Sequence, residues 1–306
     1  MELRSIGSLR VSVVGLGCNN FGMRIDEPAT GRVVGAALEA GINFFDTADI
    51  YGSTKSEEFL GRALAGRRHQ AIVATKFGMA VDDQRKGARP EYVHRAAEDS
   101  LKRLRTDYID LYQLHQPDPE VPIADTLGAL DQLVKAGKVK EIGCSNFSAN
   151  QLDEAARAAT PGTAPVVSVQ NEYSLLNREP EASVLPACER LGLAFLPFFP
   201  LASGLLTGKY EPGKAAPKDS RLSLSWTSRF TTDRNVRIAE ALKAFAAARG
   251  HTLLELAVSW LAARPCVASV IAGATSPEQV RANVAAVSWS LTPEDLSEID
   301  RLAPLT

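Results

Sequence analysis

The sequence predicts one (β/α)₈ barrel over residues 1–306. Segments typical of strands and helices alternate along the chain in about eight units, with no break in composition between them. The strand segments, such as AIVAT at 71–75, are continuous apolar runs without polar alternation, which is typical of parallel strands covered on both faces. A chain of 306 residues suits one large barrel. An open, doubly wound sheet is the alternative architecture.

The predicted strands are short apolar runs that end at glycine or at polar residues. The chain opens with a hairpin, formed by residues 2–6 and 9–13 and turned at Gly7-Ser8. Eight further strands are predicted at residues 13–16, 43–45, 71–75, 108–111, 139–143, 166–169, 193–196 and 267–271.

Helices are predicted between these strands from amphipathic spacing and from signals at their ends. Gly41 follows one helix as a stop signal, and Pro90 opens another at its first turn. The predicted helices are residues 28–40, 53–64, 90–104, 123–135, 149–159, 181–191, 233–249, 253–263 and 277–286. The polar stretch 202–232 is too long for an ordinary connection, so it is a candidate functional loop.

Composition excludes several classes of function. The net charge is −2 and no basic stripe carries interleaved aromatic residues, so we expect no nucleic-acid partner. No apolar run approaches the roughly 20 residues of a membrane helix, and the opening residues do not resemble a secretory signal. The four cysteines are widely spaced, which favours reduced thiols and a cytoplasmic protein.

Polar and ionisable residues follow directly after the apolar runs of adjacent predicted strands. Asp46 ends the second strand and Tyr51 lies just beyond it, while Lys76 and His115 end the third and fourth. Each of these residues alone is common as a cap, an ion-pair partner or a structural side chain. In a barrel, however, the carboxyl ends of the strands converge on one face, where active sites form. We therefore expect these four side chains to share a pocket.

This set of side chains suits proton donation to an oxygen atom. A lysine ammonium near a phenol lowers the phenol's pKa from its ordinary value of about 10. A carboxylate beside the lysine keeps it charged, so Asp46, Lys76 and Tyr51 form a tuned general acid. His115 can orient a carbonyl oxygen through a hydrogen bond. Reduction of a carbonyl by hydride places negative charge on that oxygen, and the hydride implies a nicotinamide cofactor.

Seven segments in order resemble the aldo-keto reductase family, and they span nearly the whole chain. They are FFDTADIYG at 44–52, VATKFG at 73–78, LYQLHQPDP at 111–119, GKVKEIGCSNF at 137–147, VQNEYSLLNR at 169–178, PLASGLLTGKY at 200–210 and IAGATSPEQVRAN at 271–283. The resemblance implies a barrel capped at its N-terminal end by the hairpin. It also implies NAD(P)H bound across the C-terminal face without a Rossmann fold, and a small carbonyl compound as the substrate.

The resemblance assigns roles to individual residues. Tyr51 would donate the proton, within a tetrad with Asp46, Lys76 and His115. Phe198 stands where the family usually has tyrosine, and its ring can stack on the nicotinamide. The cofactor-binding residues implied by the resemblance are Ser145, Asn146 and Gln170 for the carboxamide, Phe198, Pro200, Leu201, Ser203, Gly204, Leu206 and Lys209 for the nicotinamide and pyrophosphate, and Gly273, Thr275, Gln279 and Asn283 for the adenosine.

The family resemblance favours NADPH over NADH. Members of the family that prefer NADPH often carry a basic residue at positions matching Gly273, Thr275 or Gln279, whereas none of these is basic here. A guanidinium holds a 2′-phosphate best, so Arg281 or Lys209 would have to take that role.

Aromatic and apolar residues on the predicted loops are candidates for the substrate pocket. They are Phe21, Met23, Phe77, Trp226 and Phe230, with Tyr173 as a further possibility. Ordinary core or loop packing is the alternative interpretation for each of them. An apolar wall would suit aldehydes or ketones with hydrophobic bodies.

Two other functions are compatible with the same residues. A barrel aldolase would use Lys76 as a Schiff-base amine, which requires a lowered lysine pKa, and Asp46 would act in the opposite direction. A cofactor-binding regulatory or redox-sensing subunit with little turnover is the other alternative.

Overall fold

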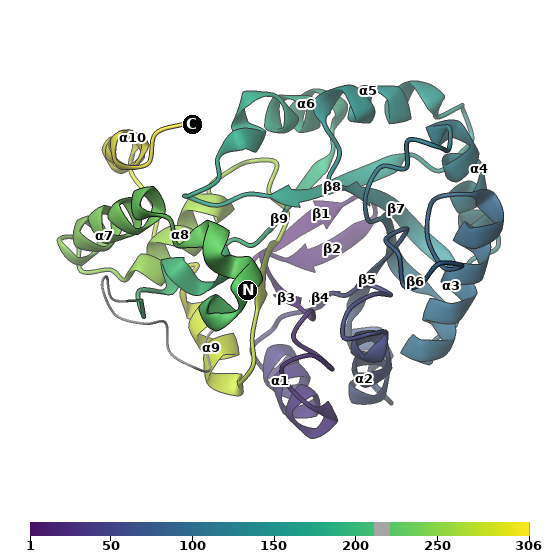
Figure 1. Cartoon of the computed structure of the whole chain (residues 1–306), viewed down its shortest axis with the longest axis horizontal. Coiled ribbons are helices and arrows are strands. Elements are labelled where there is room, and N and C mark those ends of the chain that lie inside the picture. The colour runs from purple at the N-terminus through teal and green to yellow at the C-terminus, as the bar shows by residue number, and fades with distance from the viewer. Residues whose placement is uncertain (211–220, 306) are drawn as a thin grey trace.

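The computed structural model describes residues 1–210 and 221–305. Eight parallel strands form one sheet in the order β10-β3-β4-β5-β6-β7-β8-β9. A bridge between Phe195 and Val267 brings the two edges of this sheet together, so the barrel is nearly closed. Figure 1 shows the helices in a ring outside the strands. The predicted (β/α)₈ barrel is confirmed.

The strands lie where the apolar runs predict them, with small shifts at their ends. The hairpin consists of β1 (Leu3–Ile6) and β2 (Leu9–Ser12), which pair antiparallel. The barrel strands are β3 (Val14–Gly17), β4 (Phe44–Asp46), β5 (Ile72–Phe77), β6 (Ile109–Leu114), β7 (Val139–Ser145), β8 (Val166–Glu172), β9 (Ala194–Phe198) and β10 (Val270–Gly273).

The helices also follow the prediction, with one addition. They are α1 (Glu27–Glu39), α2 (Lys55–Ala63), α3 (Pro90–Leu104), α4 (Ile123–Lys135), α5 (Ala149–Ala158), α6 (Val184–Leu191), α7 (Asp233–Ala247), α8 (Leu253–Ala262), α9 (Pro277–Ala285) and α10 (Pro293–Leu302). Helix α10 is absent from the predicted helices, although its signals are present in the sequence. Thr292 and Asp295 form a capping box, and Pro293 occupies the first turn.

The candidate loop at 202–232 contains short 3₁₀ helices where it is described. They are Ala202–Thr207, Arg221–Ser223 and Ser225–Phe230. Two further 3₁₀ helices, Arg68–Gln70 and Glu179–Ala182, lie elsewhere in the chain. Residues 211–220 of the predicted loop lie outside the described residues.

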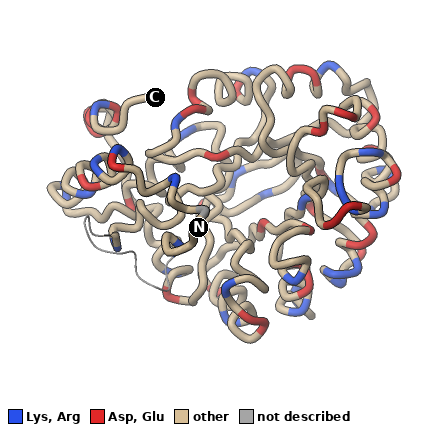
Figure 2. Tube along the Cα trace, viewed as in Figure 1, with Lys and Arg blue, Asp and Glu red and all other residues tan. Residues whose placement is uncertain are grey.

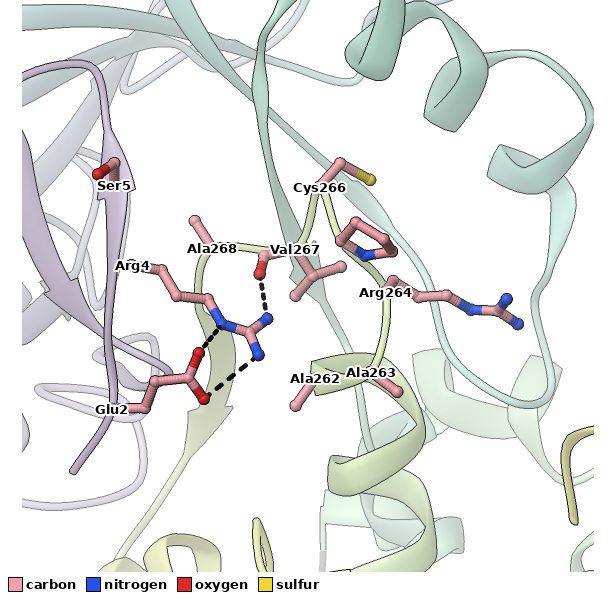
Figure 3. Close-up of a pocket in the computed structure, with 10 residues that line it drawn as sticks. Glu2, Arg4, Ser5, Ala262, Ala263, Arg264, Cys266, Val267 and Ala268 are labelled. Atoms are coloured by element: carbon pink, nitrogen blue, oxygen red, sulfur yellow. Dashed lines mark hydrogen bonds and ion pairs between the residues drawn. The ribbon is translucent and has the colours of Figure 1, made fainter. Parts of the chain in front are cut away.

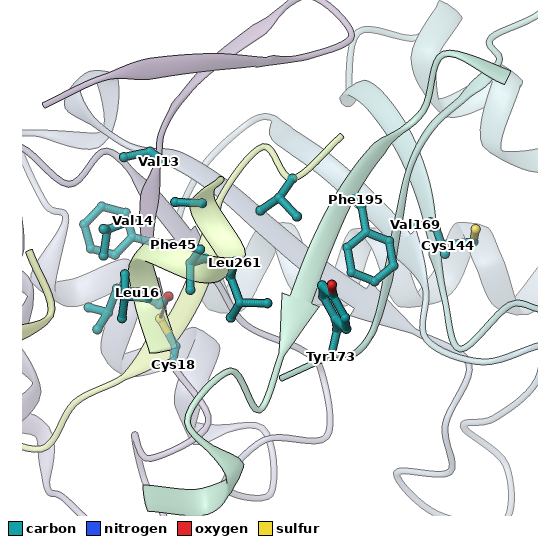
Figure 4. Packing of buried hydrophobic residues seen from close by; sticks show 14 of the residues in the cluster. Val13, Val14, Leu16, Cys18, Phe45, Cys144, Val169, Tyr173, Phe195 and Leu261 are labelled. Atoms are coloured by element: carbon teal, nitrogen blue, oxygen red, sulfur yellow. Dashed lines mark hydrogen bonds between the residues drawn. The ribbon is translucent and has the colours of Figure 1, made fainter. Parts of the chain in front are cut away.

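Strand alternation divides the buried residues into two layers. Inward-facing Phe44, Ala74 and Leu111 pack together with Ile6 and Val11 of the hairpin. Successive side chains of a strand point to opposite faces, so their neighbours point outward and pack beneath the helices. Figure 4 shows part of this outer layer, including Phe45, Val169 and Phe195. The hairpin therefore fills one end of the barrel.

Polar contacts fix the hairpin at this end. The guanidinium of Arg4 donates to the carbonyl oxygen of Val267 at 2.7 Å, and it also pairs with Glu2 (Figure 3). On the other side of the barrel, the backbone N–H of Ser8 donates to the carboxylate of Glu141 at 2.7 Å. A shallow hollow bordered by β1 and residues 262–268 lies beside Arg4 and contains none of the predicted site residues.

Charged residues lie mainly on the outer helices and loops, as Figure 2 shows. Among the described residues, no helix is both long enough and apolar enough to cross a bilayer.

Two glycines on the outer helices provide a matched test of packing. A Cβ on Gly61 in α2 would lie 2.6 Å from the backbone of Leu104, whereas a Cβ on Gly128 in α4 would meet nothing within 4 Å. We expect Gly61→Ala to lower the free energy of unfolding by about 1–3 kcal/mol, because the helices must move apart. We expect Gly128→Ala to raise it by roughly 0.5–1 kcal/mol through helix propensity. Urea denaturation measures both, and equal stability of the two variants would contradict this packing.

Candidate functional site

A polar layer lies at the carboxyl ends of the strands, above the apolar layer of the barrel. Asp46, Lys76 and Gln113 each follow an apolar inward residue by two positions on β4, β5 and β6, so their side chains also point inward. All three are buried. The amides of Gln113 and of Gln170 on β8 both donate to Asp46 Oδ1, at 3.3 and 2.8 Å.

The ion pair between Lys76 and Asp46 is the centre of this layer. Lys76 Nζ lies 2.6 Å from Asp46 Oδ2 and also donates to the carbonyl oxygen of Thr47 at 2.9 Å. The lysine is fully buried and Asp46 is 4% exposed. A buried pair of this kind is stable only if its remaining hydrogen-bonding capacity is satisfied, and Gln113 and Gln170 contribute to that.

Tyr51 completes the predicted arrangement. It lies on the loop between β4 and α2, and Lys76 Nζ donates to its hydroxyl oxygen at 3.4 Å. The His115 ring meets the Tyr51 ring edge to face, with 5.7 Å between the ring centroids. Asp46, Tyr51, Lys76 and His115 therefore lie together, although they follow three different strands.

For both Tyr51 and Lys76, burial and the neighbouring charge shift the pKa in opposite directions. Burial raises the pKa of Tyr51 above its ordinary value, while the Lys76 charge opposes this increase. The neighbouring lysine, taken alone, predicts a lowered pKa for Tyr51, and burial reverses that prediction. Burial by itself would lower the pKa of Lys76, but the nearby Asp46 and Tyr51 oxygens raise it above its ordinary value. The phenol is thus protonated and the amine charged at neutral pH.

His115 is held as a neutral ring. Burial, together with the Lys76 charge, lowers its pKa to about 3. Its backbone carbonyl accepts a hydrogen bond from Asn146 Nδ2 at 2.9 Å, and Asn146 adopts the left-handed conformation with φ of 61°. No described residue pairs with His115 Nδ1. The neutral ring can therefore donate one N–H and accept at the other nitrogen.

A cleft of about 950 Å³ opens above the polar layer and is lined by Asp46, Tyr51 and His115. Most of the residues expected to bind a cofactor also line it: Ser145, Asn146, Gln170, Phe198, Pro200, Leu201, Ser203, Gly204, Lys209, Gly273, Gln279 and Asn283. Two expected residues do not line the cleft. Leu206 is fully buried in the core, and Thr275 instead donates its backbone N–H and its hydroxyl to Gln279 Oε1.

The cleft contains features that suit an elongated polar ligand. Ser203 Oγ and Asn20 Oδ1 are buried and have no hydrogen-bond partner among the described residues. A Cβ on Gly273 would lie 3.1 Å from Asn20 Nδ2, so glycine keeps the wall of the cleft open at this point. The residues present therefore fit a dinucleotide cofactor, whose sugars and phosphates can pair with such groups.

Several lining residues were not predicted from the sequence. Asn19 and Arg24 lie on the loop after β3, and Arg221 reaches across from the loop after β9 to donate to Asn19 Oδ1 at 3.1 Å. Burial and the like charge of Arg24 lower the pKa of Arg221 to about 10. The sequence does show both arginines, but it does not show that two distant loops meet.

Comparisons with known proteins give one family. The model described as "Aldo/keto reductase family" matches residues 13–304. The chain belongs to the aldo/keto reductase family. Membership implies carbonyl reduction with a nicotinamide cofactor.

Two curated relatives match this chain over most of their length. A protein of Oryza sativa subsp. japonica described as a probable voltage-gated potassium channel subunit beta is 35% identical over 98% of this chain and 96% of its own. A probable aldo-keto reductase 1 of Glycine max is 35% identical over 96% of this chain and 86% of its own.

Solved structures of the family agree in fold. The holo form of an aldo-keto reductase from Bacillus halodurans superimposes with a TM-score of 0.83 at 34% identity, covering 100% of this chain and 97% of that one. A glycerol dehydrogenase from Gluconobacter oxydans gives 0.85 at 32% identity, covering 98% and 94%.

The expected substrate-pocket residues of this aldo/keto reductase lie in different places. Met23 lines the cleft and is 51% exposed. Phe21 and Phe77 do not line it. Both are fully buried in the core. Phe77 faces the outer layer and stacks on Tyr112, because Lys76 takes the inward position of β5. Phe230 packs against Phe199 and does not line the cleft.

Two other aromatic residues are among the candidates for the substrate pocket. Tyr173 is buried in the core and donates to Glu181 at 2.8 Å. The side chain of Trp226 lies outside the described residues.

The lowered pKa of His115 can be tested by NMR. We expect its ring nitrogens to keep the chemical shifts of a neutral imidazole from about pH 8 down to about pH 5. The unfolded chain binds this proton near pH 6.5, and the folded chain binds it only near pH 3. His115 should therefore lower the free energy of unfolding as the pH is reduced from about 6.5 to about 3. The variant His115→Gln identifies the signals. A transition to imidazolium near pH 6.5 would contradict the burial of this ring.

Proposed function

We propose that the protein reduces aldehydes or ketones to alcohols with NAD(P)H, using Tyr51 as the proton donor. The observation that supports this proposal is the chain of contacts from Asp46 through Lys76 Nζ to the Tyr51 hydroxyl, which lies in the wall of the cleft. The family to which the chain belongs carries out this chemistry. The reaction is reversible in principle, so the same groups serve alcohol oxidation.

The bound nicotinamide would supply hydride to the carbonyl carbon. Tyr51 donates its proton to the carbonyl oxygen as negative charge develops there. Lys76, which Asp46 keeps charged, stabilises the phenolate that remains. His115 is neutral and can donate a hydrogen bond that orients the carbonyl. Ser145, Asn146 and Gln170 would hold the carboxamide, and Phe198 would stack on the ring.

Two alternative functions differ in their support. A Schiff-base aldolase requires a neutral lysine, but Asp46 and Tyr51 raise the pKa of Lys76, which opposes that chemistry. A cofactor-binding subunit with little turnover is supported by one observation, the relative described as a probable potassium channel subunit. Tight cofactor binding with negligible turnover across an aldehyde panel would favour this second function.

The variant Tyr51→Phe tests the proton donor. It keeps the ring and removes the hydroxyl, so we expect kcat for 4-nitrobenzaldehyde to fall at least about 100-fold. The cofactor dissociation constant, measured by fluorescence, should not change. Tyr112→Phe is the matched control, because the Tyr112 hydroxyl is buried outside the cleft and has no partner among the described residues. An unchanged rate in Tyr51→Phe would remove this tyrosine from its role.

We further propose that NADPH is preferred to NADH. Lys209 lines the cleft and can bind a 2′-phosphate, whereas Arg281 is paired with Glu278 at 3.0 Å. We expect kcat/KM to be roughly tenfold higher for NADPH, since one charge-assisted hydrogen bond contributes about this much. Lys209→Met should lower the value for NADPH more than the value for NADH, and Arg281→Met serves as the comparison. A clear preference for NADH would refute this proposal.

A further inference from the structure

The segment that carries Tyr51 is strained directly after the tyrosine. Gly52, Ser53 and Thr54 follow one another with φ of 58°, 55° and 77°, in the left-handed region. Residues with a Cβ rarely adopt this conformation, so contacts with the surrounding elements must hold the segment in place. Those contacts therefore determine where the Tyr51 hydroxyl lies.

Asp49 connects this segment to β5 and α3. Its backbone N–H donates to the Lys76 carbonyl at 3.1 Å, and its Oδ2 accepts from the Tyr92 hydroxyl of α3 at 3.5 Å. The side chain is 1% exposed and does not line the cleft. Its Oδ1 has no hydrogen-bond partner among the described residues. A carboxylate can accept about four hydrogen bonds, so Asp49 lacks the partners that a buried negative charge needs.

The basic group nearest to this position is paired with another acid. Glu57 of α2 is fully buried, and its Oε2 accepts from Arg103 Nε of α3 at 2.6 Å. Glu57 Oε1 accepts from the hydroxyl of Thr75, which directly precedes Lys76 on β5. Among the described residues, no basic group forms an ion pair with Asp49. Two buried acids therefore share one guanidinium beside β5.

The groups around Asp49 favour its neutral form. Burial raises the pKa of Asp49 to about 7, and the Glu57 charge acts in the same direction. The Arg103 charge, a backbone N–H and the Tyr92 hydroxyl oppose this rise only in part. The remaining titratable neighbour is Tyr112 of β6, whose pKa is raised by burial and by the Asp49 charge.

Ionisation of Asp49 bears directly on Tyr51. A carboxylate at this position gains solvation by moving towards water, and Asp49 is only two residues from Tyr51, so the segment moves with it. The 3.4 Å between Lys76 Nζ and the Tyr51 hydroxyl is already long for a hydrogen bond. A small displacement of the segment therefore breaks this contact.

We propose that Asp49 is a positioning residue for Tyr51. As a neutral carboxylic acid it holds the Tyr51 segment against β5 and α3, and its ionisation moves the Tyr51 hydroxyl out of reach of Lys76. The pKa of His115 is about 3 and that of Tyr51 lies above its ordinary value, so neither group accounts for a transition near neutral pH. The effect on turnover rests on the proposed carbonyl reduction.

The first experiment measures kcat for 4-nitrobenzaldehyde with NADPH from about pH 6 to about pH 9. In the wild-type protein we expect kcat to fall about tenfold per pH unit above about pH 7, with an unchanged cofactor dissociation constant. Asp49→Asn carries an amide that is neutral at every pH, so its kcat should stay nearly constant. Asp83→Asn is the matched control, because it makes the same change at an exposed residue and should keep the wild-type profile. A fall with the same midpoint in Asp49→Asn would overturn the proposal.

A second variant tests the same assignment without changing Asp49. Tyr92→Phe removes the hydroxyl that reaches Asp49, and this hydrogen bond lowers the pKa of Asp49. The midpoint of the kcat profile should therefore move to higher pH. Tyr112→Phe removes a buried hydroxyl that has no partner among the described residues, so it should leave the midpoint unchanged. Equal midpoints in these two variants would contradict the role of Asp49.

The pH dependence of stability does not depend on turnover. The folded chain keeps the Asp49 proton up to about pH 7, whereas an unfolded aspartate loses it at about pH 4. Stability from this group is therefore complete below about pH 4 and is lost as the pH rises to about 7. The unfolding constant of the wild type, divided by that of Asp49→Asn, should rise about tenfold per pH unit across this range. The contribution of His115 is common to both proteins and cancels in the ratio.

NMR of ¹³C-labelled tyrosine reports on Tyr51 itself. We expect its ring signal, assigned with Tyr51→Phe, to shift with a midpoint at about pH 7 in the wild type and not in Asp49→Asn. These shifts without reduction of any aldehyde would reject the proposed function and leave the positioning of Tyr51 by Asp49 standing. An unshifted Tyr51 signal in the wild type would overturn the proposal, because Asp49 would then titrate without moving Tyr51.

Discussion

The arrangement of the site depends on one buried ion pair, between Lys76 and Asp46. Both residues lie inside the barrel, where charges lose most of the solvation that water provides. Removing one partner from such a pair typically costs about 3–5 kcal/mol, because it leaves the other charge buried and unpaired. Hydrogen bonds from neighbouring groups therefore stabilise the pair. Gln113 and Gln170 donate to Asp46, and the Thr47 carbonyl accepts from Lys76. These contacts fix the Lys76 ammonium next to the Tyr51 hydroxyl.

The residues that stabilise the barrel and the residues of the candidate site lie at opposite ends of its axis. The apolar layer and the hairpin fill the N-terminal end, and the polar layer occupies the C-terminal end. A glycine makes this polar layer possible, since a Cβ on Gly143 would lie 2.6 Å from Ser168 Oγ and 3.2 Å from Gln113 Cγ. Side chains of ordinary size at position 143 would displace the amide that contacts Asp46. This division agrees with the general rule that barrel enzymes place active sites at the carboxyl ends of their strands.

The barrel could be predicted from the sequence because its strands are uninterrupted apolar runs. The proximity of Asp46, Tyr51, Lys76 and His115 could be predicted because strand ends converge. The failures have physical causes. Phe77 was assigned to the pocket, although alternation with the inward Lys76 places it in the outer layer. The pKa of Tyr51 was expected to fall because a sequence shows a neighbouring lysine but not the burial that opposes it. The approach of Arg221 to Asn19 joins two loops that are far apart in the chain, and no local pattern encodes it.

The attachment of the hairpin has a consequence for synthesis of the chain. Arg4 donates to Val267, so the hairpin strand β1 is held by a residue that is synthesised 263 positions later. The neighbours of Ile6 and Val11 in the barrel include Ala268 and Ile271. On the ribosome, the hairpin therefore cannot complete its contacts until residues 267–271 have emerged, and part of its apolar face stays uncovered until then. A nascent chain of this protein should thus need protection from aggregation, and the barrel should gain its resistance to proteases late and in a single step.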